Sequence, residues 1–104
     1  MTVQRQVREG RLRQGEEERI SYTLTTTPWG SAPSDAAVKL YELAAGAWAD
    51  VSATKLSGAP SVQGDVITCP LVLGLTAGNL YRLEIKFVSS GNTFEAYAEI
   101  EGER

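Results

Sequence analysis

The chain has 104 residues, a length typical of one domain, and carries a formal net charge of −3. This acidic balance argues against nucleic-acid binding, because contact with the phosphate backbone needs a basic face. The sequence contains no histidine, which removes Ser-His-Asp catalysis, Cys-His catalysis and histidine-ligated zinc. We therefore expect no enzyme, no metal site and no cofactor.

Cys69 is the single cysteine, so neither an intramolecular disulfide nor a cluster of thiolate ligands can form. It lies in an extended pattern, where we expect a small, buried apolar residue. The N-terminus lacks the apolar stretch of a secretory signal peptide, and no run approaches the ~18 apolar residues of a membrane-spanning helix. We expect synthesis in the cytoplasm without a signal peptide, followed by residence there or export inside a larger particle.

Alternation of apolar and polar residues dominates the chain and predicts strands separated by turns. Seven or eight strands are predicted, along residues 3–8, 18–25, 37–43, 47–51, 54–56, 66–73, 80–88 and 93–101. In the clearest half-buried strand, Ile20, Tyr22 and Leu24 point to one side and polar residues to the other. Residues 1–17 are expected to hold a partly mobile first strand and a turn, and residues 27–35 a loop rich in proline, glycine and serine.

The middle of the chain admits more than one prediction. The alanine-rich stretch 43–49 has helical propensity, but it is too short to nucleate a helix and contains Gly46. A hairpin with its turn at 44–46 is therefore predicted. Pro70 falls inside the strand 66–73 and predicts a bulge or a strand end, because proline cannot donate a hydrogen bond to a sheet.

The last two strands form the most clearly predicted hairpin, with a turn at 90–92. Their alternating residues define two inward faces. The first consists of Tyr81, Leu83, Ile85 and Phe87. The second consists of Phe94, Ala96, Ala98 and Ile100.

The segment that joins residues 75 and 85 is the most informative about the fold. Leu75 precedes a turn closed by Gly78, and Tyr81 then opens an alternating strand. This order is typical of a tyrosine corner, in which the tyrosine hydroxyl bonds a backbone group a few residues upstream. Because no convincing helix accompanies it, we predict an all-β, immunoglobulin-like β-sandwich of seven or eight antiparallel strands, in a single domain over 1–104.

Charges support one strand pairing in this fold. The first predicted strand carries Arg5 and Arg8, whereas the last carries Glu95, Glu99 and Glu101. The first strand of an immunoglobulin-like sandwich often lies beside the last. Ion pairs are therefore predicted along that seam, each contributing about 0.2–1 kcal/mol.

Three aromatic residues are candidate interaction residues. Trp29 lies between a proline and a glycine, and it either plugs the open end of the core or is exposed as an anchor for a partner. Trp48 either packs on the sheet or joins Tyr41 and Leu43 in an apolar strip on the outer face of the hairpin. The first strand and the strand at 54–56 are candidate open edges, to which a second chain could add a strand.

Two resemblances follow from these residues. The segment Leu75-Thr-Ala-Gly-Asn-Leu-Tyr81-Arg-Leu83 resembles the Leu-x-Pro-Gly-x-x-Tyr-x-Val segment of fibronectin type III domains, with Ala77 in place of the usual proline. A longer likeness over 34–103 includes Ser61-Val-Gln-Gly-Asp-Val66, the same tyrosine segment, a Ser-Ser-Gly91 turn and a closing strand. It resembles the small immunoglobulin-like proteins encoded among head and tail structural genes of phages and prophages, although those proteins often have two glycines where Gly74 is followed by leucine.

The phage resemblance implies a structural role, incorporation in a virion, and neither catalysis nor a cofactor. The leading prediction is thus a non-catalytic structural or accessory protein that contacts other proteins of an assembly or itself, without nucleic-acid or membrane partners. The alternative is a carbohydrate- or peptide-binding module that uses the Trp29 loop together with Asp35 or Ser34. No residue pattern identifies a small-molecule or glycan ligand.

Overall fold

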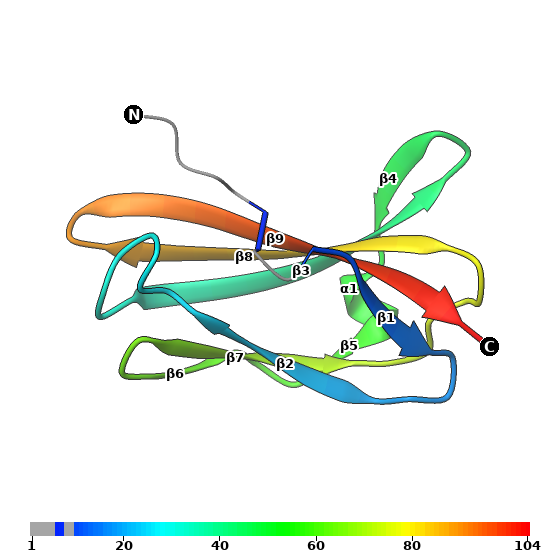
Figure 1. Cartoon of the computed structure of the whole chain (residues 1–104), viewed down its shortest axis with the longest axis horizontal. Coiled ribbons are helices and arrows are strands. Elements are labelled where there is room, and N and C mark those ends of the chain that lie inside the picture. Colours follow the sequence, from blue (N-terminus) through cyan, green and yellow to red (C-terminus); the bar gives the residue numbers. More distant parts are fainter. Residues whose placement is uncertain (1–5, 8–9) are drawn as a thin grey trace.

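The computed structural model describes residues 6–7 and 10–104, and it consists of two β-sheets packed face to face (Figure 1). The described residues form nine strands and one helical turn: β1 (Leu12–Gly15), β2 (Ile20–Thr25), β3 (Ser34–Ala44), β4 (Ala47–Asp50), α1 (Ser52–Lys55), β5 (Leu56–Ser57), β6 (Ser61–Gln63), β7 (Val66–Val72), β8 (Leu80–Ser89) and β9 (Asn92–Glu103). The larger sheet has the order β1-β9-β8-β3-β4. The smaller has the order β2-β7-β5, and β6 also pairs with β7. The predicted all-β class is confirmed.

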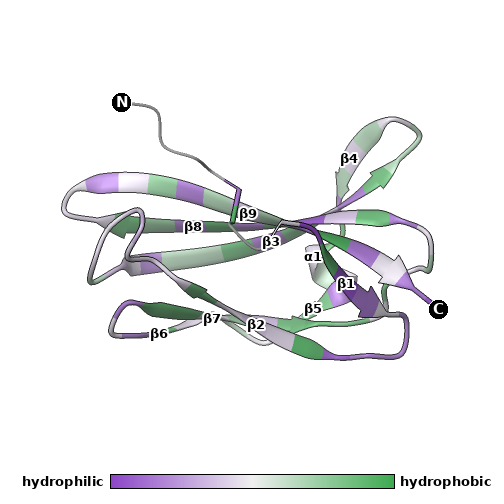
Figure 2. Cartoon of the chain, viewed as in Figure 1, coloured by the Kyte–Doolittle hydropathy of each residue, from purple (hydrophilic) through white to green (hydrophobic). Residues whose placement is uncertain are grey.

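Alternating apolar residues of both sheets meet between them and form the core. The buried residues of β8 and β9 are Tyr81, Leu83, Ile85, Phe87, Ala96, Ala98 and Ile100. Figure 2 shows the corresponding alternation of hydrophobic and hydrophilic residues along these two strands. Both predicted inward faces are confirmed, with Phe94 half-buried at the end of its row.

The first paired segment differs from the prediction. Most of the predicted strand 3–8, including Arg5 and Arg8, lies outside the described residues, but Gln6 forms a parallel bridge with Tyr97 of β9. β1 continues this parallel pairing farther along β9, so the strands are not all antiparallel as predicted. The sequence does not reveal β1, because Leu12 is its only large apolar residue.

Gln14 explains how so polar a strand is held in place. Its side chain is 1% exposed, and its amide nitrogen donates to the backbone oxygens of Val72 and Glu18 at 2.8 and 3.0 Å. A buried amide is tolerated when its hydrogen-bonding groups are satisfied. Gln14 therefore ties β1 in the larger sheet to β7 in the smaller one.

Ion pairs run along the predicted seam from Arg11 and Arg13, whereas Arg5 and Arg8, for which the pairing was predicted, lie outside the described residues. Arg11 lies 3.6 Å from Glu99, and Arg13 lies 3.7 Å from Glu101 and 3.4 Å from Glu103. Both arginine side chains are at least half exposed, so each pair contributes no more than about 1 kcal/mol. These surface ion pairs therefore add little to the stability of the fold.

The predicted strand at 54–56 is wrong for its first two residues. The N–H groups of Thr54 and Lys55 both donate to the Val51 carbonyl oxygen, which produces the helical turn α1. The Asp50 carboxylate accepts the Ser52 N–H at 2.9 Å and supports the start of this turn. Only Leu56 and its successor pair with β7. With β1 and β6 added, the described strands number nine rather than seven or eight.

The turn predictions at the middle of the chain are confirmed. β3 and β4 form a hairpin around Ala45 and Gly46, whose φ angles of 52° and 80° are those of a type I′ turn. Between Ser21 and Thr23 of β2, the register against β7 shifts by one residue close to Pro70. This is the predicted bulge. β3 begins at residue 34, so the preceding loop is slightly shorter than predicted.

Tyr81 connects the turn before β8 to strand β3. Its hydroxyl accepts the Thr76 N–H at 2.8 Å and donates to the Glu42 carboxylate. Burial, followed by the hydrogen bond to Glu42, raises the pKa of Tyr81. The hydrogen bond from Tyr81 is the main cause that lowers the pKa of Glu42. Leu75 is buried, and Gly78 has a φ of 87° at the turn.

Candidate interaction surface

The β3–β4 hairpin extends beyond the body of the two sheets (Figure 1) and exposes apolar side chains. Among the described residues, the exposed large apolar side chains are Leu43 at 38%, Trp48 at 39% and Val62 at 41%. Leu43 and Trp48 are directly opposite in the hairpin register, so they share one face. Tyr41 lies two residues before Leu43 on the same face and is half-buried. We call Tyr41, Leu43 and Trp48 the hairpin strip.

The hairpin strip ends where the outer face of the larger sheet becomes charged. Arg82 lies opposite Tyr41 in the register, and its guanidinium carbon lies 3.8 Å from the centre of the Tyr97 ring. The Arg82 Nε atom lies 2.9 Å from the Glu84 carboxylate. Charged side chains therefore border the hairpin strip on the larger sheet. Trp48, at 39% exposure, keeps surface available to a partner.

Strand β4 also presents unpaired backbone groups. The Val51 N–H donates to the Leu40 carbonyl oxygen at 2.9 Å, which marks this as a hydrogen-bonded pair of the hairpin ladder. Hydrogen-bonded and non-hydrogen-bonded pairs alternate in an antiparallel ladder. In the observed register, the backbone groups of Trp48 and Asp50 therefore point away from β3. They face the open edge of the larger sheet, and every residue of β4 is exposed.

This edge lacks most of the devices that prevent strand pairing, which include lysine, proline, bulges and covering loops. At the opposite edge of the same sheet, β1 is flanked by Arg11 and carries Arg13. In the smaller sheet, β5 has two residues and is soon followed by Gly58 and Pro60. β4 has only its short length and Asp50. The sequence predicted open edges at the first strand and at the strand 54–56. It did not predict the open edge of β4.

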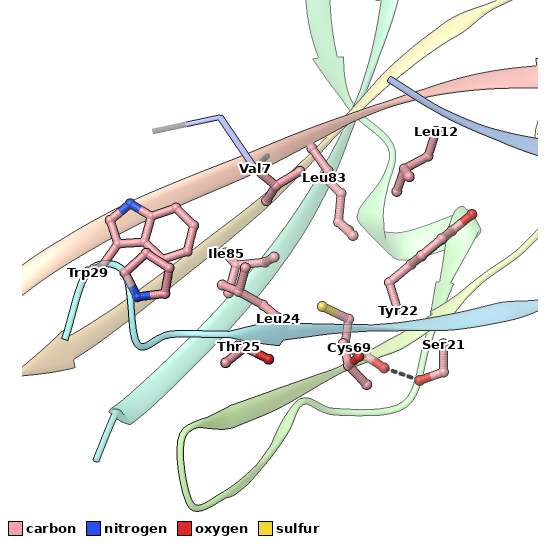
Figure 3. A pocket seen from close by; sticks show the side chains of 13 residues that line it. Val7, Leu12, Ser21, Tyr22, Leu24, Thr25, Trp29, Cys69, Leu83 and Ile85 are labelled. Atoms are coloured by element: carbon pink, nitrogen blue, oxygen red, sulfur yellow. Dashed lines mark hydrogen bonds between the residues drawn. The ribbon is translucent and has the colours of Figure 1, made fainter. Parts of the chain in front are cut away.

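Trp29 lines a second surface feature, a pocket of about 530 Å³ between the two sheets (Figure 3). Its ring meets the Phe87 ring edge-on, with the ring centres 6.5 Å apart. Trp29 is half-buried, so it contacts the core as a plug would and also keeps exposed surface. All five residues from Ser21 to Thr25 line the pocket, so the backbone edge of β2 borders it.

The pocket offers few polar groups to a ligand. The Ser21 hydroxyl donates to the Cys69 carbonyl oxygen, and the Tyr22 hydroxyl donates to the Gln14 side chain at 2.8 Å. Burial raises the pKa of the Cys69 thiol to about 11, which agrees with the predicted buried role of this residue. Neither Asp35 nor Ser34, one or the other of which the alternative prediction pairs with Trp29, lines the pocket.

Within the part of the chain that the structure describes, no group of three or more acidic or cysteine residues could hold a metal ion. The same residues contain no helix with the length and apolar character needed to cross a membrane. No family model, curated protein or solved structure matches the chain.

Proposed function

We propose that this protein is a non-catalytic structural or accessory component of a phage- or prophage-type particle. It acts through protein–protein contacts, and the hairpin strip together with the open edge of β4 is its contact surface. The observation that carries this proposal is the coincidence of exposed Leu43 and Trp48 with unpaired backbone groups on the same hairpin. Apolar anchors beside an open edge suit strand addition by a partner.

The fold that accompanies this proposal is an immunoglobulin-like sandwich with a tyrosine corner. It is supported by the hydrogen bond between the Tyr81 hydroxyl and the Thr76 N–H and by the buried Leu75. The pairing of the first part of the chain with the last strand also supports it. The sequence resemblance to small phage and prophage proteins adds the class of assembly.

The proposal is tested by quantifying the protein in purified particles from cells that express each of two variants. Trp48→Asp places a charge on the hairpin strip, whereas Val62→Asp introduces the same charge at a comparably exposed apolar residue of β6. We expect the Val62 variant to be incorporated like wild type and the Trp48 variant to fall roughly tenfold, a loss of about 1.4 kcal/mol of contact energy. Absence of the wild-type protein from particles, or equal incorporation of both variants, would contradict the proposal.

A second candidate function is supported by the pocket beside Trp29. Its volume of about 530 Å³ falls within the range of ligand sites, and its lining is mainly apolar. The hydroxyls of Ser21 and Tyr22 already bond within the protein, so a carbohydrate would find few partners. An extended peptide that places an apolar side chain in the pocket and bonds the edge of β2 fits better.

Tryptophan fluorescence separates this candidate from the first. In a Trp48→Phe background, Trp29 is the only tryptophan, and we would titrate it with a Thr-Val-Thr-Leu-Thr-Val-Thr peptide and with a panel of glycans. Saturable change with the peptide, lost in Ser21→Pro, would support peptide binding at the edge of β2. No change with the peptide would remove this candidate.

A further inference from the structure

We propose that the open edge of β4 pairs with the same edge of a second copy of this chain. The two strands run antiparallel about a two-fold axis, and the larger sheets of both copies join in one continuous sheet. This inference rests on the proposed function, because it names the partner of the same hairpin. Closed two-fold contacts are the commonest way in which a chain associates with itself.

The backbone geometry selects one register. Only Trp48 and Asp50 point their N–H and C=O groups outward, and antiparallel pairing requires outward groups on both strands. A two-fold axis at Ala49 places Trp48 opposite Asp50 of the partner subunit, and Asp50 opposite Trp48 of the partner subunit. Both pairs are then hydrogen-bonded, and each pair exchanges two bonds. All the outward groups of β4 are satisfied in this register.

The two neighbouring registers are poorer. An axis at Trp48 places Asp50 opposite Gly46 of the partner subunit, which belongs to the turn and not to β4. An axis at Asp50 sets two carboxylates directly opposite each other, an arrangement that is destabilising in a sheet. The register centred on Ala49 alone combines complete backbone bonding with a diagonal, rather than a directly opposed, placement of the two Asp50 carboxylates.

The side chains fit the selected register on both faces. Ala49 meets Ala49 of the partner subunit in a non-hydrogen-bonded pair, where the Cα atoms are about 4.5 Å apart and small side chains suit the close approach. On the other face, Trp48 and Trp48 of the partner subunit are diagonal neighbours at roughly 7–8 Å, within reach of aromatic side chains. Leu43 extends the apolar contact behind each tryptophan.

The contact is short, because β4 has four residues. The dimer is therefore expected to be weak and dependent on concentration, as small interfaces usually are. In a particle, neighbouring copies are held close together, so a weak contact is populated through a high effective concentration.

Disulfide trapping tests the register. In the proposed dimer, two cysteines at position 49 satisfy the Cα separation that a disulfide needs, whereas two cysteines at position 47 are separated by several further residues along the strands. Ala49→Cys and Ala47→Cys both change exposed alanines of the same strand, and the native Cys69 is buried. With oxidised glutathione as the oxidant, we expect the linked dimer to form at least about tenfold faster for Ala49→Cys. Equal rates for the two variants would overturn the register.

Sedimentation velocity from micromolar to millimolar concentration tests the association itself. We expect a monomer–dimer equilibrium for wild type and for Val62→Asp, and roughly tenfold weaker association for Trp48→Asp, which places two carboxylates opposite each other at each pair. A wild-type protein that stays monomeric over the whole range would overturn the inference.

The two proposals fail in different ways. If the isolated protein is monomeric but Trp48→Asp still lowers incorporation into particles, the hairpin binds another protein, and only the second copy is refuted. If Trp48→Asp abolishes the dimer and leaves incorporation unchanged, the dimer is supported, and the proposed role of the hairpin in particles is refuted.

Discussion

Removal of the Tyr81 hydroxyl tests how the turn before β8 is held to the rest of the fold. In Tyr81→Phe the Thr76 N–H loses its acceptor at 2.8 Å, and the Glu42 carboxylate loses a donor. Hydrogen bonds to charged groups contribute about 1.5–3 kcal/mol, and neutral ones about half as much. Because Glu42 is only half-buried and water can replace part of the lost bond, we expect a loss of about 2 kcal/mol in the free energy of unfolding.

For a domain of this size, about 2 kcal/mol corresponds to a fall in Tm of roughly 8–16 °C. Urea unfolding followed by tryptophan fluorescence measures the free energy directly. Tyr41→Phe is the matched control, because Tyr41 lies on the outer face and is expected to change stability by less than about 0.5 kcal/mol. A double-mutant cycle with Glu42→Gln then isolates the coupling between the two side chains.

The pH dependence of this effect has a defined sign. Hydrogen bonds from Tyr81 and Asn79 lower the pKa of Glu42 below its ordinary value of 4.5 in the folded protein. The carboxylate therefore contributes stability that is present above the unfolded pKa and is lost as the pH falls through the folded one. The difference between wild type and Tyr81→Phe should narrow in acid. A variant that unfolds within about 0.5 kcal/mol of wild type at neutral pH would refute this reasoning.

Three further predictions concern the core and the seam. Gly102→Ala should lose about 1–3 kcal/mol in urea unfolding, because a Cβ there would approach the Thr76 carbonyl oxygen to well below the sum of their van der Waals radii. An unchanged midpoint would contradict the close approach. Burial raises the pKa of the Cys69 thiol to about 11, so this thiol should react slowly with a disulfide reagent at neutral pH and rapidly in urea. Immediate reaction of the native protein would show that the pocket exposes the thiol. Because the Arg13 side chain is 70% exposed, Arg13→Ala should change the free energy of unfolding by less than about 1 kcal/mol, and the change should disappear at high salt. A larger loss that persists at high salt would contradict a surface ion pair.

The strands with regular alternation are the part of the fold that the sequence predicts well. β8 buries a complete row of alternating residues, and β9 buries its row from Ala96 onward, so the burial of both strands is visible in the alternation of the sequence. The hairpin at Gly46 and the bulge near Pro70 are also predicted, because glycine and proline restrict the backbone locally.

No alternation or other residue pattern in the sequence indicates β1 or α1. β1 buries Gln14, a polar residue whose bonds go to groups far away in the sequence, so alternation cannot reveal it. α1 depends on hydrogen bonds to Val51 and on the neighbouring Asp50 carboxylate, whereas its residues have no strong helical pattern. Both cases depend on tertiary contacts that local propensity does not contain.

The candidate surface, too, is partly predictable from local sequence and partly dependent on contacts between distant segments. Sequence alternation places Tyr41, Leu43 and Trp48 on one face of a hairpin, as the structure has it. It does not show that β4 ends the sheet, because strand order depends on which distant segment pairs with β3. The pocket beside Trp29 is likewise built from both sheets and is not visible in any single stretch of residues.

The central claim, that the molecule makes its contacts through the β4 edge, is tested most directly by amide hydrogen exchange. The exchange of the chain in assembled particles is compared with that of the dilute isolated protein. The account predicts slower exchange in the β3–β4 hairpin, including the outward N–H groups of Trp48 and Asp50, because these groups become paired. Unchanged exchange at both residues would contradict it, and slowing confined to β2 and Trp29 would favour the pocket instead.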